Sequence, residues 1–152
     1  MVDAPAPTPA LRLEPTLETD EAAIQWLGAA IDAFNERAMG VGQDRRISVW
    51  LRDGDGTVKG GCTGYIVGGD ECYVTLLYVD ESLRGQGHGE KLLTALEELA
   101  AREKCRFVAL DTFDFQAPGF YRRLGYVSFG RIDDFFRGHG RTWFKKMLGA
   151  PA

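Results

Sequence analysis

Six residues near the middle of the chain, Arg84-Gly85-Gln86-Gly87-His88-Gly89, combine three glycines at alternate positions with a basic side chain. They follow an apolar run at 73–79 and precede an amphipathic segment. The first amides of a helix have no intrahelical partner, and the helix dipole adds partial positive charge there. Glycines let the backbone come close to an anion. The pattern therefore predicts a binding loop for the phosphates of a ligand.

Two common phosphate motifs do not fit this loop. A P-loop ends in Gly-Lys-Ser/Thr, whereas this loop ends in Gly89-Glu90-Lys91. The dinucleotide fingerprint GxGxxG, begun at Gly85, needs a glycine where the chain has Glu90. Both mismatches disfavour a nucleoside triphosphatase and a dinucleotide-binding fold. The plain alternative is a glycine turn that only joins a strand to a helix.

The elements around the loop follow from the spacing of apolar residues. The run Tyr73–Val79 is continuously apolar and β-prone, which is typical of a central strand buried on both faces. Leucines at helical spacing predict a helix that ends near Lys104, and Phe107–Leu110 is predicted to be a second buried strand. A strand, a helix and a strand at this distance form a crossover between parallel strands.

Further elements complete an α/β fold with a mixed sheet. We expect additional strands at 11–14, 47–51, 58–67, 126–129 and 142–148, a helix at 117–124, and a helix capped by Thr19 or Asp20. Altogether this predicts about seven strands and about three to four helices in one domain, residues 11–152, after a Pro/Ala-rich disordered tail at 1–10. Residues 53–56 lack the ligating glutamate of a calcium loop, so a hairpin turn is predicted there.

The glycine loop resembles the R/Q-x-x-G-x-G/A signature of the GNAT superfamily of N-acetyltransferases. Its setting is similar too: Leu77-Tyr78-Val79-Asp80 precedes it, and Phe120-Tyr121-Arg122-Arg123-Leu124-Gly125-Tyr126 follows about 35 residues later. The likeness covers roughly residues 70 to 130. The resemblance implies a GNAT-like fold in which the two central parallel strands splay apart, with the thioester of acetyl-CoA in the cleft between them.

The resemblance also assigns the cofactor site. It implies that the pyrophosphate binds the amides of residues 86–89 and that the pantetheine arm runs along the strand before them. Where many members have asparagine seven residues before the tyrosine, this chain has Asp114, so a hydrogen-bond donor to pantetheine is replaced by an acceptor. The residues predicted to contact the cofactor are Leu77, Tyr78, Val79, Arg84, Gly85, Gln86, Gly87, His88, Gly89, Asp114 and Phe115.

Acetyl transfer to an amine needs a neutral amine and benefits from a proton donor to the departing thiolate. A lysine-like ammonium has a pKa of about 10.4 and cannot attack while protonated. A tyrosine hydroxyl can act as the general acid, and in some family members the tyrosine that matches Tyr121 does so. The alternative is that Tyr121 only packs in an apolar helix, where Phe120 or Leu124 is expected to take the core side.

The sequence offers several candidates for the general base that deprotonates the amine. Glu71, Asp111 and Asp114 are candidates because we expect them near the ends of the two central strands. A water chain, or an amine that arrives neutral, fits the sequence equally well. Phe113 and His139 are candidates for substrate binding, since loops at strand ends commonly carry function. The alternatives are that Phe113 only packs against its neighbours and that His139 is only a solvent-exposed loop residue.

Composition bounds the remaining possibilities. The chain of 152 residues has a net charge of −4, which argues against broad nucleic-acid binding. Its three cysteines are scattered without metal-ligand spacing, so we expect no metal site and a reducing cytoplasm. No apolar run is long enough to span a membrane, and no signal peptide is apparent.

The sequence thus predicts a cytoplasmic enzyme that transfers an acetyl group from acetyl-CoA to a primary amine of a small molecule, peptide or protein. Transfer would occur by direct attack in a ternary complex, in a monomer or a homodimer. The alternative is a non-catalytic acyl-CoA-binding sensor or regulatory module, which would keep the glycine loop but need no acid. The amine acceptor carries no signature in the sequence.

Overall fold

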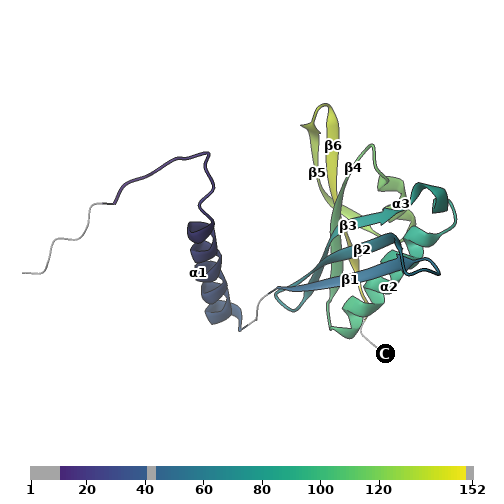
Figure 1. Cartoon of the computed structure of the whole chain (residues 1–152), viewed down its shortest axis with the longest axis horizontal. Helices are drawn as coiled ribbons and strands as arrows, with labels where there is room; N and C mark the ends of the chain where they lie inside the picture. Colours follow the sequence, from purple (N-terminus) through teal and green to yellow (C-terminus); the bar gives the residue numbers. More distant parts are fainter. Residues whose placement is uncertain (1–10, 41–43, 150–152) are drawn as a thin grey trace, which may run out of the picture.

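The computed structural model of the chain describes residues 11–40 and 44–149 (Figure 1). The predicted tail at 1–10 lies outside this part of the chain. The elements, in chain order, are α1 (Glu21–Met39), β1 (Arg45–Arg52), β2 (Val58–Val67), β3 (Glu71–Val79), the 3₁₀ turn η1 (Glu81–Leu83), α2 (His88–Arg102), β4 (Phe107–Phe113), α3 (Pro118–Arg123), β5 (Val127–Phe136) and β6 (His139–Met147).

Six strands form one mixed sheet in the order β1-β2-β3-β4-β6-β5. Among residues 11–40 and 44–149, only β3 and β4 pair in parallel, and the other neighbouring strands are antiparallel. The predicted α/β fold with a parallel central pair is confirmed, with six strands rather than about seven. The segment at 11–14 is not a strand: Leu11 is 99% and Leu13 98% exposed. A strand needs a neighbour to take up its backbone hydrogen bonds, and none of the described strands lies beside this segment.

One face of the sheet carries the hydrophobic core. The amphipathic helix α2 packs there through Leu92, Leu93, Leu96 and Ala100, all buried. Phe144 of β6 is fully buried in the same cluster. The short helix α3 lies beside α2, since a Cβ on Gly89 of α2 would stand 3.6 Å from the Phe120 ring. Both helices that follow the central strands therefore cover the same face.

The opposite face is open. Two neighbouring glycines of β2 identify the two faces of the sheet. A Cβ on Gly60 would approach Leu92 of α2, so Gly60 faces the core, whereas a Cβ on Gly61 would strike the Trp50 ring on the opposite face. Gly61 lies across from Trp50 on β1 and from Tyr78 on β3. Trp50 and Tyr78 are 52% and 57% exposed. A row of large apolar side chains thus faces outward on β1 to β3.

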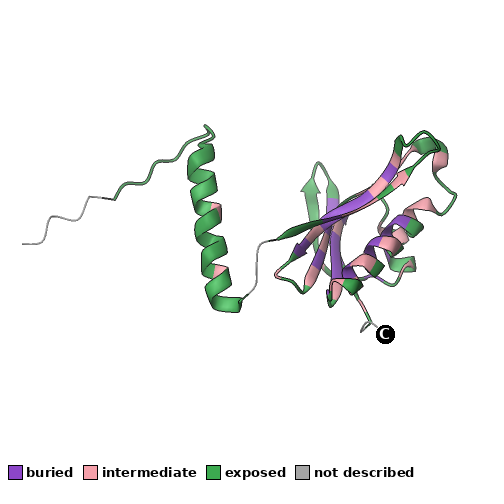
Figure 2. Cartoon of the chain, turned by 60° about the horizontal axis from the view of Figure 1, so that its bottom comes forward, coloured by how far each residue is buried: buried purple, intermediate pink, exposed green. Residues whose placement is uncertain are grey.

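Helix α1 is well defined by its ends but buries nothing. Asp20 caps it by accepting a hydrogen bond from the Ala23 amide, and Gly40 ends it in the left-handed conformation. None of its residues is buried, and Figure 2 shows it exposed along its length and apart from the sheet. It is also no candidate for a membrane span: within the described residues no helix is both long and apolar enough for one.

The predicted hairpin turn after β1 is confirmed. The Asp53 carboxylate accepts hydrogen bonds from the amides of Asp55 and Thr57, and Gly56 adopts a φ of +81° that suits glycine. These bonds satisfy turn amides that would otherwise lack partners. The turn therefore has a structural role, and none of its residues lines the cavity between β3 and β4.

Candidate active site

A cleft opens where β3 and β4 part. Their ladder ends with the pair Val74 and Leu110, although β3 continues to Val79 and β4 to Phe113. The far half of β3 still pairs with β2 on its other side. Its edge toward β4 therefore presents backbone groups without a strand partner. A cavity of about 610 Å³ fills the gap, and its walls are Val74–Val79, Arg84, Leu110–Thr112, Phe115–Ala117, Phe120 and Tyr121.

The glycine loop begins at the cleft, because its first residue, Arg84, lines the cavity wall. Gly85 and Gly87 have φ angles of +75° and +78°, a region that favours glycine, and a Cβ on either would point into open space. Gly87 is the N-cap of α2 and supplies no side-chain cap. The first amides of α2 thus lack an intrahelical acceptor and face the loop. This arrangement fits a phosphate group.

Gly89 differs from the other two glycines. It has no positive φ, and a Cβ there would make an ordinary contact with Phe120. Unlike Gly85 and Gly87, Gly89 therefore needs no backbone angles that a β-carbon disfavours, because it lies inside regular helix. Its amide still belongs to the uncapped first turn.

Arg84 holds the loop against β3. Its Nε donates to the Val79 carbonyl at 3.2 Å, and its guanidinium lies over the Tyr78 ring, 5.4 Å from the centroid. It also pairs with exposed Glu81 at 3.3 Å. Arg84 therefore brings a positive charge to the cleft wall while bracing the turn, which suits an anionic ligand.

Tyr121 lies in the core and borders the cavity at once. It is 9% exposed, and its ring packs against Phe120, Tyr126 and Phe144. Phe120 and Leu124 pack against the core as expected but are only partly buried, whereas Tyr121 is the buried residue of α3. No described group forms a hydrogen bond with the Tyr121 hydroxyl, yet among the described residues no buried side-chain polar atom lacks a partner, so the hydroxyl reaches open space. Burial, with smaller effects of Cys62 and Asp111, raises the pKa of Tyr121 to about 12.

Asp111 lines the cavity with both carboxylate oxygens already engaged. Oδ1 accepts a hydrogen bond from the Tyr73 hydroxyl at 2.5 Å, and Oδ2 accepts one from Arg141 Nε at 2.5 Å. Burial alone would raise the pKa of Asp111, but the bonds from Arg141 and Tyr73 outweigh it and lower the pKa. An ionised carboxylate held in this way is a weak proton acceptor.

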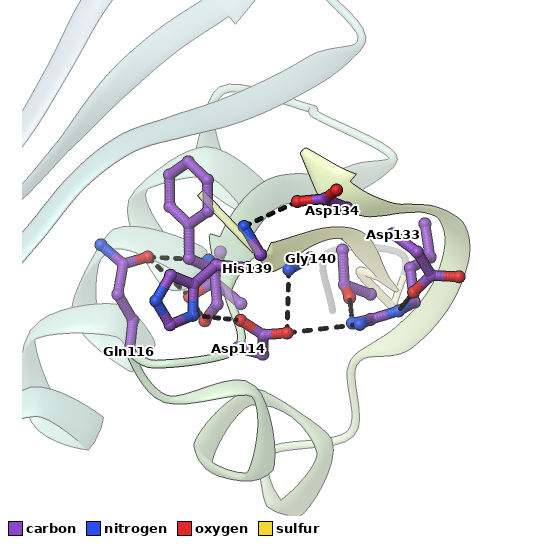
Figure 3. A network of polar contacts seen from close by, with 11 residues as sticks. Asp114, Gln116, Asp133, Asp134, His139 and Gly140 are labelled. Carbon is purple, nitrogen blue, oxygen red and sulfur yellow. Dashed lines mark hydrogen bonds and ion pairs between the residues drawn. The ribbon is translucent and has the colours of Figure 1, made fainter. Parts of the chain in front are cut away.

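Asp114 lies against the β5–β6 hairpin, beside His139 and Gly140 (Figure 3). Oδ2 accepts hydrogen bonds from the Gly140 amide at 2.9 Å and from Arg131 at 3.3 Å, and Oδ1 lies 3.4 Å from His139 Nδ1. The Gly140 bond, aided by Arg131, lowers the pKa of Asp114. Asp114 is absent from the cavity wall. The structure therefore gives it a bracing role and offers no support for its proposed contact with pantetheine.

Glu71 does not reach the cleft. It is the first residue of β3 and pairs with Phe107 at the closed end of the parallel ladder. The sequence predicts Glu71, like Asp111, at the ends of the central strands where the cleft lies. The two strands part only at their carboxyl ends, however, and Glu71 is at the amino end of β3. Glu71 thus stands at the wrong end of β3 to act as a base in this cavity.

The aromatic residues after β4 form one stack beside the cavity. Phe115 lines the cavity, stacks on Phe113 at 5.2 Å between centroids, and meets His139 edge-on at 4.8 Å. Phe113 and His139 therefore adjoin the site through Phe115 without forming its wall.

Three residues around the cleft were missed by sequence reasoning. Gln116 lines the cavity, and its Oε1 accepts from the Thr112 hydroxyl and the Phe113 amide, both at 2.9 Å. This leaves its side-chain amide donors to face a ligand. Tyr73 and Arg141 hold Asp111 from the two neighbouring strands. The alternation in β6 could have pointed to Arg141, but its partner is fixed only by the register between strands.

The cysteines and potential metal ligands add nothing to this site. Cys62, Cys72 and Cys105 are all free and buried, and burial raises the pKa of Cys62 and of Cys72 to about 12. Among residues 11–40 and 44–149, no three His, Cys, Asp or Glu side chains are grouped so as to hold a metal ion.

Comparisons with known proteins match this geometry. Residues 12–126 match the acetyltransferase (GNAT) family. The acetyltransferase Atu2258 of Agrobacterium fabrum is 34% identical over 116 residues, which are 76% of this chain and 84% of that protein. Blasticidin-S acetyltransferase of Streptomyces morookaense is 43% identical over 82 residues, or 53% of this chain and 59% of that protein.

A solved structure extends the match to the whole fold. The crystal structure of a protein assigned as an acetyltransferase from Agrobacterium tumefaciens superposes with a TM-score of 0.83 and 30% identity, and it covers 91% of this chain and 100% of that one. Coverage this high must reach past β1 into α1, because residues 44–152 make up only about 72% of the chain. The chain therefore belongs to the acetyltransferase (GNAT) family.

Proposed function

We propose that the protein transfers the acetyl group of acetyl-CoA to a primary amine of a small molecule. The observation that carries the proposal is the cavity that runs from Arg84, the first residue of the glycine loop, along the open edge of β3 to Tyr121. The uncapped first amides of α2 follow Arg84 directly in the same loop. The loop suits the pyrophosphate and the strand edge suits the amide-rich pantetheine arm. The thioester would then lie in the cavity between β3 and β4.

The reaction forms a C–N bond and breaks a C–S bond. The neutral amine attacks the thioester carbonyl, and an unpaired amide on the β3 edge stabilises the oxyanion. The electron pair of the C–S bond leaves on the CoA sulfur, and the proton lost by the amine leaves through water. Two observations support a water route: Asp111 has both oxygens bound, and Asp114 and Glu71 lie outside the cavity wall.

Tyr121 is assigned to the departing sulfur. A phenol with a pKa of about 12 is protonated at neutral pH, so it can donate a hydrogen bond to the thiolate. A thiol has a pKa of about 8.5, so complete transfer of the phenolic proton is uphill. We therefore assign Tyr121 the stabilisation of the thiolate by a hydrogen bond, with the proton itself equilibrating with solvent.

The cleft and one relative support a small molecule as the acceptor. Blasticidin-S acetyltransferase acts, by its name, on a small antibiotic, and it shares 43% identity over 82 residues with this chain. The outer cavity wall here, with Phe115 and Gln116, offers an aromatic surface and amide donors. Such a wall suits a compact polar amine.

The test is an acetylation screen. Purified protein with acetyl-CoA is assayed for CoA release against nucleoside antibiotics, aminoglycosides, polyamines and peptide N-termini, and mass spectrometry locates the acetyl group. We expect turnover with at least one small amine and an added mass of one acetyl group on its nitrogen. CoA binding without turnover across the panel would instead indicate a non-catalytic acyl-CoA-binding module.

A further inference from the structure

Helix α1 carries an apolar stripe that no other described part of its chain covers. Ile24, Leu27, Ile31 and Phe34 recur at helical spacing and are 55%, 62%, 51% and 59% exposed. Amphipathic helices of globular proteins bury such a stripe against a partner surface. The match to the A. tumefaciens structure runs through α1, so the helix belongs to the shared fold.

A matching surface lies bare on the sheet of the same chain. Trp50, Leu76 and Tyr78 are 52%, 67% and 57% exposed on the face opposite α2. Together with Gly61 they line a mainly apolar groove of about 220 Å³. The sequence therefore contains both halves of an interface, a helix stripe and a sheet face, and leaves both open to solvent.

The net charges of the two parts bear on what the arm, residues 1–43, can pack against. Residues 1–43 contain seven acidic and two basic side chains, a net charge of −5. Residues 44–152 contain fifteen acidic and sixteen basic side chains, a net charge of +1. Like charge therefore opposes the pairing of one arm with another, whereas the nearly neutral rest of a chain does not repel the arm.

We propose that α1 is an exchanged arm: the stripe of one copy packs on the Trp50–Leu76–Tyr78 face of a second copy, and the exchange is reciprocal. Only residues 40–44 separate α1 from β1, and the helix stands away from its own sheet in both views (Figures 1 and 2). Exchange of an identical element gives a closed two-fold dimer in which each bare face is covered once.

The exchange would complete the acceptor side of the site, a step that rests on the proposed function. Leu76 and Tyr78 line both the apolar groove and the catalytic cavity. A helix laid on the groove therefore walls the open mouth of the cavity. Each acceptor pocket would then be built from two chains, with α1 of the second copy setting which amines fit.

The test is cross-linking between distinguishable copies. Leu27→Cys is placed in a chain with one affinity tag and Leu76→Cys in a chain with another, and the two are co-expressed and treated with a bis-maleimide. The native cysteines are buried and compete little. We expect a covalent pair that carries both tags, at twice the mass of one chain. Ala29→Cys, on the opposite side of α1, is the matched control and should link at least fivefold less.

A single chain with both cysteines separates exchange from folding back. If the bis-maleimide links the two positions within one chain, or links nothing, the exchange is wrong. Light scattering gives a second measurement: Ile31→Asp should convert a dimer to a monomer, whereas Ala29→Asp should not. Because α1 packs on nothing in its own chain, a monomer of the parent protein would also overturn the exchange.

The outcome is independent of the catalytic assignment. Thermal shift with CoA on the parent protein, which carries no substitution in the cavity wall, reports the cofactor site separately. Mixed cross-links without any response to CoA would support the exchange and overturn the proposed function. A response to CoA without mixed cross-links would do the reverse.

Discussion

At the scale of residues, the polar side chains of the cleft differ in whether their oxygens already form hydrogen bonds. The Tyr121 hydroxyl faces the cavity without a described partner, whereas both oxygens of Asp111 are bound by neighbouring strands. A group can change partners during a reaction only if its bonds in the resting state are few. Tyr121 is therefore the better placed of the two to act on the reacting atoms, and Asp111 is better suited to position the wall.

Tyr121→Phe tests the proposed hydrogen bond to the departing thiolate. The change removes only the hydroxyl, so the packing against Phe120 and Phe144 is retained. We expect kcat to fall by about 10²-fold or more, in line with loss of one hydrogen-bond donor to a developing anion, with the Kd for CoA changed less than twofold. Single-turnover kinetics and calorimetry measure the two quantities. An unchanged single-turnover rate would remove Tyr121 from the reaction.

The pH dependence tests the absence of a protein base. The pKa of Asp111 is lowered and that of Tyr121 is raised to about 12, so neither changes protonation between pH 5 and 10. We expect kcat/KM to rise about tenfold per pH unit below the pKa of the acceptor amine, because only the neutral amine attacks. The midpoint should move with the amine when acceptors of different pKa are compared. A midpoint fixed near neutrality for every amine would reveal a base on the protein.

Gly87→Val tests the phosphate loop. A β-branched residue is strained at a φ of +78°, and its side chain would project into the open space where phosphate is proposed to bind. We expect CoA affinity to fall at least tenfold, about 1.4 kcal/mol, with a smaller effect on pantetheine. Calorimetric titration measures both, and circular dichroism checks the fold. Gly89→Ala is the matched control and should bind CoA within about threefold of the parent; equal affinity in folded Gly87→Val would place the phosphates elsewhere.

At the scale of elements, α2 is fixed to the sheet by a buried polar cluster as well as by its leucines. Glu97 of α2, which is 8% exposed, accepts hydrogen bonds from the Tyr126 hydroxyl at 2.8 Å and from Lys146 at 2.7 Å. Tyr126 follows α3 and Lys146 lies on β6. One carboxylate thus ties together the helix behind the glycine loop, the end of α3 and a central strand.

Glu97→Ala should be costly for that reason. It leaves a phenol and an ammonium without their partner in a low-dielectric setting, which we expect to lower the free energy of unfolding by about 2–3 kcal/mol. Glu98→Ala, next along α2, removes an exposed carboxylate that lies 3.9 Å from Arg102 and should cost less than about 0.5 kcal/mol. Urea unfolding of both variants measures the difference. Equal costs would mean that the cluster contributes no net stability.

At the scale of the whole molecule, the fold separates a packed layer from an open one. Helices α2 and α3 cover one face of the sheet, and the opposite face of β1 to β3 is bare. The cleft lies where β3 and β4 part. The N-terminal arm carries the surface that would close that face. Binding of a cofactor and docking of the arm should therefore both act on the stability of the whole.

Acetyl-CoA should stabilise the whole fold by mass action. At about 100 times its dissociation constant it adds about 2.7 kcal/mol, which for a chain of this size raises the Tm by about 5–10 °C. A thermal-shift titration checks this, with Gly87→Val as a variant expected to respond only at higher concentrations. A flat response to both CoA and acetyl-CoA would show that the cofactor assignment is wrong.

The sequence by itself determined what depends on neighbouring residues. The uncapped glycine turn before α2, the Asp20 cap of α1 and the hairpin turn at 53–56 all follow from local backbone preferences, which act within a few residues. The crossover between β3 and β4 follows as well, because a strand, helix and strand at short spacing allow little else.

Only the tertiary structure decided what depends on distant partners. Asp111 is held by residues 38 and 30 positions away in the chain, and Asp114 is turned from the cleft by Gly140, 26 positions away. Glu71 lies at the closed end of the cleft because of the register between β3 and β4, which cannot be read from the sequence. The amphipathic pattern of α1 fixed its helical form but not its partner, since hydrophobic burial is non-directional and any apolar surface of suitable shape can satisfy it.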